Sequence, residues 1–120
     1  MFFSFGGGYV QGDAGTYGCV MAPAYLPQGV TVTDMFASVW DAEGAYNIDV
    51  NLRRVDNFTG TTATMATAST SGTFTGVQVV NDASITDPLI LYPDYSYYLT
   101  ACLQSGNTRL YSVRLYYTAP

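Results

Sequence analysis

Residues 46–55 read YNIDVNLRRV, and their side chains alternate between apolar and polar. Because successive side chains of a β-strand point to opposite faces, this period of two predicts a strand with one buried face and one solvated face. The predicted buried face carries Tyr46, Ile48, Val50 and Leu52. Half-buried strands of this kind are typical of antiparallel sheets, and the stretch therefore predicts an all-β domain.

Shorter runs with the same alternation cover most of the remaining chain. They predict further strands at residues 17–22, 30–40, 61–69, 73–80, 88–91, 95–103 and 109–118. The sequence QSGN at residues 104–107 predicts a hairpin between the last two, which are the most apolar pair and are expected at the centre of a sheet. No capped stretch has a period of 3.6 residues, so almost no helix is expected. We expect one domain over residues 1–120, an antiparallel, jelly-roll-like β-sandwich of about eight or nine short strands.

The composition argues against several classes of function. Charged residues make up 11% of the chain, the net charge is −5, and histidine and lysine are absent. The chain therefore lacks the commonest general base and zinc ligand, and it lacks the amine of Schiff-base chemistry. Four arginines against nine acidic residues disfavour binding to nucleic acid or to anionic lipid. We expect no enzyme activity, no cofactor, no nucleic-acid partner and no insertion into a membrane.

Asp41 and Glu43 are the acidic residues with the best case for a metal ion. Carboxylates in the loops of a sandwich can bind Ca²⁺, but their spacing is not that of an EF-hand. The same residues also fit an ordinary hairpin turn with solvated acids, and this interpretation is favoured.

Cys19 and Cys102 are far apart in the sequence and belong to no CxxC motif. In an oxidising compartment they could form a disulfide, which would stabilise the fold by roughly 4–5 kcal/mol in the chain-entropy model. Otherwise they would be two buried thiols, and both interpretations stay open. Asn57, followed by Phe58 and Thr59, has the form of an N-glycosylation sequon.

The N-terminal residues are apolar and precede three consecutive glycines. They are too few and too uncharged for a signal peptide. We expect a strand within residues 1–10 that joins the chain's own sheet. The alternative is a strand that inserts into the next subunit, as in donor-strand polymers, with Phe2, Phe3 and Phe5 as the assembly residues.

Aromatic residues are numerous, with 11 tyrosines and one tryptophan. Exposed rings could stack on sugars, and Trp40, Tyr92 and Tyr95 are candidates for binding glycans. Tyrosine also stabilises the margins of a core and is enriched at subunit interfaces, so these two interpretations remain alternatives.

Four segments resemble a β-sandwich module of secreted and cell-surface bacterial proteins. They read APxxLPxGxxVT at residues 22–33, LxRV at 52–55, YSYYL at 95–99 and LYxVRxxYT at 110–118. The resemblance implies the fold and an extracellular or cell-surface location, and it transfers no catalytic residue. The two cysteines and the phenylalanine-rich start are additions to the pattern of this module.

These observations predict a non-enzymatic extracellular structural protein that forms a homo-oligomer or polymer, as the subunit of a surface fibre, filament or sheath. The small number of charges leaves the edges of the sheets poorly guarded against association. The first alternative is a carbohydrate-binding or adhesive module with a polysaccharide partner. The second alternative is a virion fibre or decoration protein.

Overall fold

The strand predicted from residues 46–55 is present as β5 (Asp49–Asp56), with Val50 and Leu52 fully buried on its inner face. Tyr46 precedes the strand and is exposed, contrary to the predicted pattern. The computed structural model describes residues 4–6, 9–12, 18–42, 44–72, 76–103 and 106–120, where every regular element is a β-strand. For residues 4–6 it describes the backbone.

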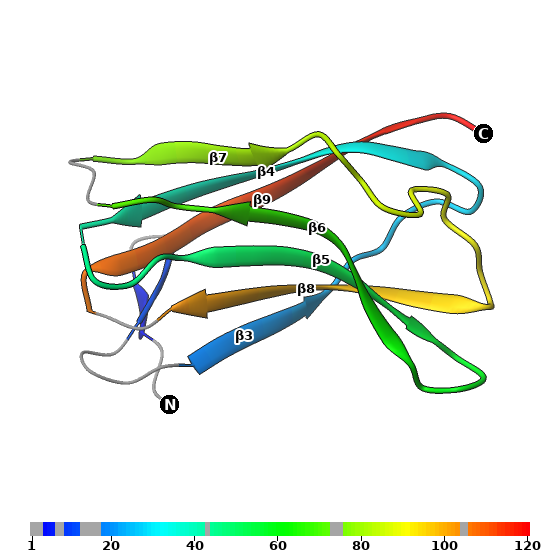
Figure 1. Ribbon diagram of the computed structural model, residues 1–120, viewed down its shortest axis with the longest axis horizontal. Coiled ribbons are helices and arrows are strands. Elements are labelled where there is room, and N and C mark those ends of the chain that lie inside the picture. The colour runs from blue at the N-terminus through cyan, green and yellow to red at the C-terminus, as the bar shows by residue number, and fades with distance from the viewer. Residues whose placement is uncertain (1–3, 7–8, 13–17, 43, 73–75, 104–105) are drawn as a thin grey trace.

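The strands form two antiparallel sheets that pack face to face (Figure 1). Sheet A has the order β1-β2-β9-β4-β7, and sheet B has the order β3-β8-β5-β6. The bounds in sheet A are β1 (Ser4–Gly6), β2 (Tyr9–Gln11), β4 (Thr31–Asp41), β7 (Gln78–Asp82) and β9 (Thr108–Thr118). Sheet B is completed by β3 (Gly18–Pro23), β6 (Thr62–Ser69) and β8 (Tyr95–Leu103). The predicted all-β sandwich is confirmed.

The strand pairs are nested in the manner of a jelly roll. β5 pairs with β6 across a short turn, β4 pairs with β7 outside them, β3 with β8, and β2 with β9. The pairs alternate between the two sheets, and the β9–β4 and β8–β5 ladders complete each sheet. This order is the double Greek key of a jelly roll.

The predicted hairpin between the last two strands is wrong. β8 lies in sheet B and β9 lies in sheet A, so residues 104–107 connect the two sheets. Each strand has other partners: β9 pairs with β4 from Thr31↔Thr118 to Asp41↔Thr108, and β8 pairs with β3 and β5. Both strands are interior to their sheets, as expected of apolar strands.

Two other predicted strands differ from the structure. The strand predicted at residues 73–80 is described as β7 from Gln78 onward. Residues 88–91 form no strand, although Leu89 makes an isolated bridge to Thr31. The connection from β4 to β5 crosses between the sheets, so the hairpin turn expected at Asp41 is also wrong.

The core consists of the inward side chains of both sheets. Sheet A contributes Met35 and Val39, and sheet B contributes Val50, Leu52 and Leu103, each 0% exposed. Burial of these aliphatic side chains is the main favourable contribution to folding, at roughly 1.5–3 kcal/mol for each one. The inward set leaves the alternate residues of each strand on two outer faces of different chemistry.

Candidate functional site

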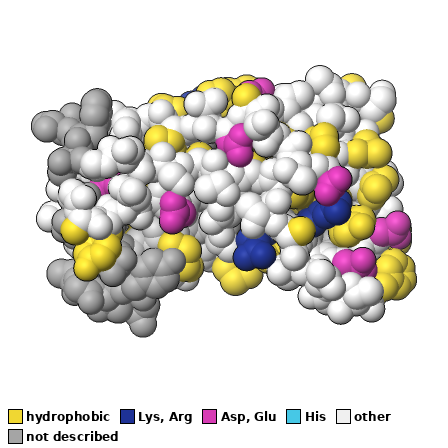
Figure 2. All heavy atoms as spheres, viewed as in Figure 1, with side chains coloured by type: hydrophobic (Ala, Val, Ile, Leu, Met, Phe, Trp, Pro, Cys, Tyr) yellow, Lys and Arg dark blue, Asp and Glu magenta, His cyan; other side chains and the backbone are white. Residues whose placement is uncertain are grey.

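The outer face of sheet B is polar and carries few charges. Figure 2 views the molecule from this side, where uncharged, non-apolar surface predominates over β8, β5 and β6. The edge strand β3 has the sequence GCVMAP and is apolar, with Met21 69% exposed. Asn51 links neighbouring strands, because its Nδ2 donates to Thr100 Oγ1 at 3.4 Å and its Oδ1 accepts from Thr67 Oγ1 at 2.7 Å. Ser69 Oγ donates to Asp49 Oδ1 at 2.6 Å. These side chains satisfy one another, which is typical of a solvated sheet face.

The outer face of sheet A is aromatic. Phe36 and Trp40 alternate with the buried residues of β4 and therefore point away from the core. Val79 is 55% exposed and Tyr116 is 48% exposed. We call this surface the aromatic face, and it consists of Tyr9, Phe36, Trp40, Val79, Arg109 and Tyr116.

Ring contacts hold the aromatic face in place. The Arg109 guanidinium carbon lies 4.4 Å from the centre of the Tyr9 ring and 4.5 Å from the Trp40 ring. Phe36 and Tyr116 meet edge to face with 5.3 Å between ring centres. Each contact joins neighbouring strands, so the rings are fixed before any partner binds.

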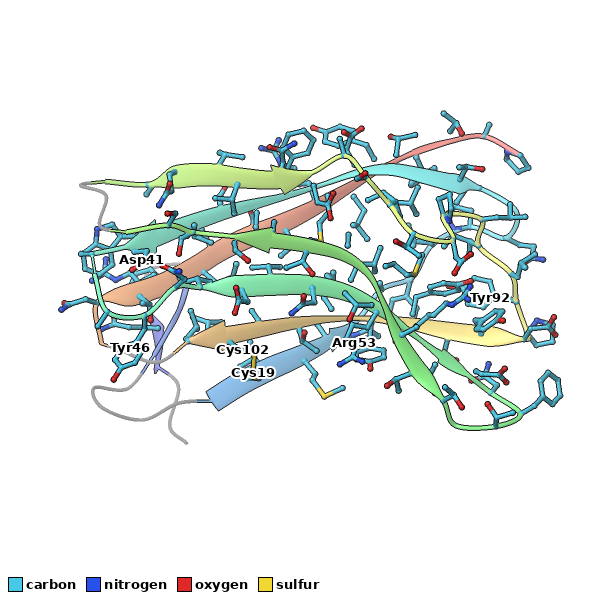
Figure 3. All side chains as sticks on the ribbon, in the orientation of Figure 1. Cys19, Asp41, Tyr46, Arg53, Tyr92 and Cys102 are labelled. Atoms are coloured by element: carbon cyan, nitrogen blue, oxygen red, sulfur yellow. A yellow bond between two sulfur atoms is a disulfide. The ribbon has the colours of Figure 1, made fainter. Side chains whose placement is uncertain are left out.

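The three predicted glycan-binding residues do not come together. Trp40 immediately precedes Asp41, which Figure 3 labels at one end of the long axis, whereas Tyr92 is labelled at the other end. The Tyr92 hydroxyl accepts the Leu26 N–H at 3.3 Å. The Tyr95 ring lies 4.1 Å from the Arg54 guanidinium carbon. Tyr92 and Tyr95 are half-buried against the core rather than presented as a platform.

Tyr97 shows the same structural use of tyrosine. Its buried ring packs edge-on against Tyr92 with 5.5 Å between ring centres, and its hydroxyl accepts the Leu91 N–H at 2.9 Å. Burial raises the pKa of Tyr97 above the usual 10.0, because the anion would lose its hydration. This end of the sandwich is therefore a tyrosine-lined part of the core.

Cys19 and Cys102 form a disulfide, which settles the two interpretations of these residues (Figure 3). They are direct partners in the β3–β8 ladder.

The side chain of Asn57, the first residue of the sequon, makes two hydrogen bonds within the protein. Its Nδ2 donates to the Pro93 carbonyl at 2.7 Å, and its Oδ1 accepts from Ser96 Oγ at 2.9 Å.

Asp41 is 0% exposed and accepts a hydrogen bond from Thr70 Oγ1. Glu43, the other predicted Ca²⁺ ligand, lies outside the described residues. Within the described part of the chain, no group of three or more His, Cys, Asp or Glu side chains could hold a metal ion. The buried Asp41 is thus part of the packing between the sheets rather than a residue on a solvated turn.

The N-terminal strand pairs within its own chain, since β1 is antiparallel to β2 with Phe5 opposite Val10. Phe2 and Phe3 lie outside the described residues, as does the side chain of Phe5.

An apolar cavity of about 340 Å³ opens between the sheets beside β2 and β3. No local sequence pattern predicts this cavity, because it depends on which strands lie at the edge. It is lined by Val10, Val20, Val50, Leu99, Leu110 and Val113, with Met21, Ala22, Thr100 and Ala101 completing the wall. On the opposite side, the Thr67 N–H donates to Asp82 Oδ2 at 2.9 Å and ties β6 to β7.

Comparison with protein-family models, with curated proteins and with solved structures gives no match for this chain. In the part of the chain that the structure describes, no helix is long and apolar enough to cross a membrane.

Proposed function

We propose that this protein is a non-enzymatic structural subunit that associates with other copies of itself through the aromatic face. The assembly would be an extracellular fibre, filament or sheath. The observation that supports this proposal is the contrast between the two outer faces. In sheet B, β5, β6 and β8 present hydrogen-bonded hydroxyls and amides, and the exposed Met21 lies on the edge strand β3. Sheet A presents Phe36, Trp40 and Tyr116 together with Arg109.

The aromatic face has the composition of a protein interface. Tyr, Trp, Phe and Arg are enriched at interface cores, and exposed apolar patches mark sites of association. Its ring contacts also reduce the side-chain entropy lost on binding, because the rings are already held by Arg109 and by one another.

The disulfide supports a location outside the cytosol, where such bonds form and persist. Jelly rolls serve in viral capsids and in lectins alike, so the topology does not choose between a surface filament and a virion. Electron microscopy of the assembled protein would separate a filament from a closed shell or a decorated particle.

Two acidic substitutions on the aromatic face, Val79→Asp with Tyr116→Asp, are expected to weaken self-association roughly 100-fold, because buried like charges repel and lose their hydration. Light scattering after size-exclusion chromatography measures the mass as a function of concentration. Emission from Trp40, the single tryptophan, should shift as the wild-type protein assembles.

The matched control is Thr62→Asp with Thr64→Asp, which adds the same charge to the outer face of sheet B. Both residues are exposed beside Arg53, whose Nη2 donates to Thr62 Oγ1 at 3.1 Å. The control should assemble like the wild type. A wild-type protein that stays strictly monomeric at high concentration would refute the proposal.

The carbohydrate-binding alternative depends on the same surface, because Trp40 and Tyr9 are its rings beside the Arg109 donors. Added polysaccharide would then shift Trp40 emission without changing the mass of the protein assembly. Unchanged emission across a panel of polysaccharides would remove this alternative.

A further inference from the structure

The side of the sandwich at β2 and β3, where the apolar cavity opens, combines two features that β-strand addition requires. β3 is the edge strand of sheet B, pairing with β8 on one edge, and no described strand pairs with its other edge. The apolar cavity lies directly beneath this edge, between the sheets. A strand added to such an edge gains main-chain hydrogen bonds, and alternate side chains supply the specificity by filling pockets.

The chemistry of the cavity defines its occupant. Nine of the ten lining residues are apolar, Thr100 is the exception, and no charged side chain takes part. Met21 at the rim is 69% exposed. An occupant must therefore offer large apolar side chains at every second position of an extended segment.

The chain itself contains such a segment. In residues 1–5, Met1, Phe3 and Phe5 share one side of an extended strand. In the chain's own sheet this segment contributes three paired residues, Ser4–Gly6, to β2. β1 is the edge strand of sheet A and pairs with β2 alone, so few hydrogen bonds are lost if the segment leaves.

We propose that the edge of β3 and the apolar cavity form the acceptor site for the N-terminal segment of a second copy, with Phe3 and Phe5 inserted between the sheets. This inference rests on the proposed function in one respect, because it requires self-association. It adds a second, heterologous joint, and such head-to-tail joints generate rings or filaments.

The full-length chain, produced with p-benzoylphenylalanine in place of Phe3, tests this joint by photo-crosslinking. Light and heavy-isotope copies are mixed, assembled and irradiated, and the linked peptides are identified by mass spectrometry. Crosslinks from position 3 to the lining residues Val20, Leu99 or Val113 should join light to heavy copies. Val20→Lys, which puts a charge at the cavity, should reduce these crosslinks at least about tenfold, since inward charges guard strand edges.

Leu89→Lys is the matched control, because Leu89 is a 45% exposed aliphatic residue outside the cavity. It should leave the crosslinks unchanged. If position 3 links only within its own chain, or never to the cavity lining, the acceptor site is wrong while assembly through the aromatic face stands. A wild-type chain that remains monomeric overturns both proposals.

Discussion

Replacing Cys19 and Cys102 together by serine is expected to lower the free energy of unfolding by about 4–5 kcal/mol. The disulfide joins residues separated by 83 positions, and a crosslink over so long a loop removes much of the entropy of the unfolded chain. A domain of this kind has roughly 5–15 kcal/mol of total stability, so this loss is a large fraction of it. Denaturant unfolding with and without reductant measures the effect.

The control is Met21→Ser with Thr100→Ser, which changes a cross-strand pair of the same two strands, two positions along the ladder from the cysteines. It removes side-chain contacts without removing a covalent bond, and we expect a loss of about 1 kcal/mol. Reductant should bring the wild type down to the stability of the double cysteine variant and leave that variant unchanged. A wild type that keeps its stability under full reduction would show that the bond is not a stabilising crosslink.

Replacing Thr70 by valine is expected to cost about 3 kcal/mol, because one hydroxyl satisfies two buried groups. Thr70 Oγ1 accepts the Ile48 N–H at 2.9 Å and donates to the buried Asp41 carboxylate. Asp41 ends β4 in sheet A, whereas Thr70 follows β6 in sheet B, so this hydroxyl ties the two sheets together. Valine has nearly the same shape but neither accepts nor donates a hydrogen bond.

Thr70→Ser keeps the hydroxyl and loses one methyl group, and it should cost about 1 kcal/mol. Chemical denaturation of both variants measures the difference. Equal losses for valine and serine would contradict the role given to the hydroxyl and would assign the effect to packing.

The strands themselves were predictable because their signal is local. Alternation around Val50 and Leu52 reports the burial of each side chain, and the structure follows it from Asp49 to Leu52, as far as the register shift between Leu52 and Arg53. The predicted solvated face of this strand also agrees with the structure, because Asp49 and Asn51 accept hydrogen bonds from Ser69 and Thr67 on the outer side of the sheet.

The pairing of strands was not predictable in the same way, because it depends on contacts between distant segments. Residues 104–107 have the composition of a hairpin turn, yet the same residues serve equally well to cross from sheet B to sheet A. The aromatic face was missed for this reason. Tyr9, Trp40 and Arg109 come from three strands, and their contact follows from a register that no local pattern encodes.

The nesting of the strand pairs also predicts an order for folding. Among the nested pairs, β5 and β6 enclose the shortest loop, residues 57–61. Each outer pair must enclose the pairs within it, so the entropic cost of closing the loop rises from the inner pair to the outer pairs. Cys19 and Cys102 belong to the β3–β8 pair, and we expect them to meet only after the two inner pairs have formed. Thiol trapping during oxidative refolding should find both cysteines free until most of the sheet signal has appeared. In that order of events, the disulfide stabilises a sandwich whose strands have already paired and does not direct their pairing.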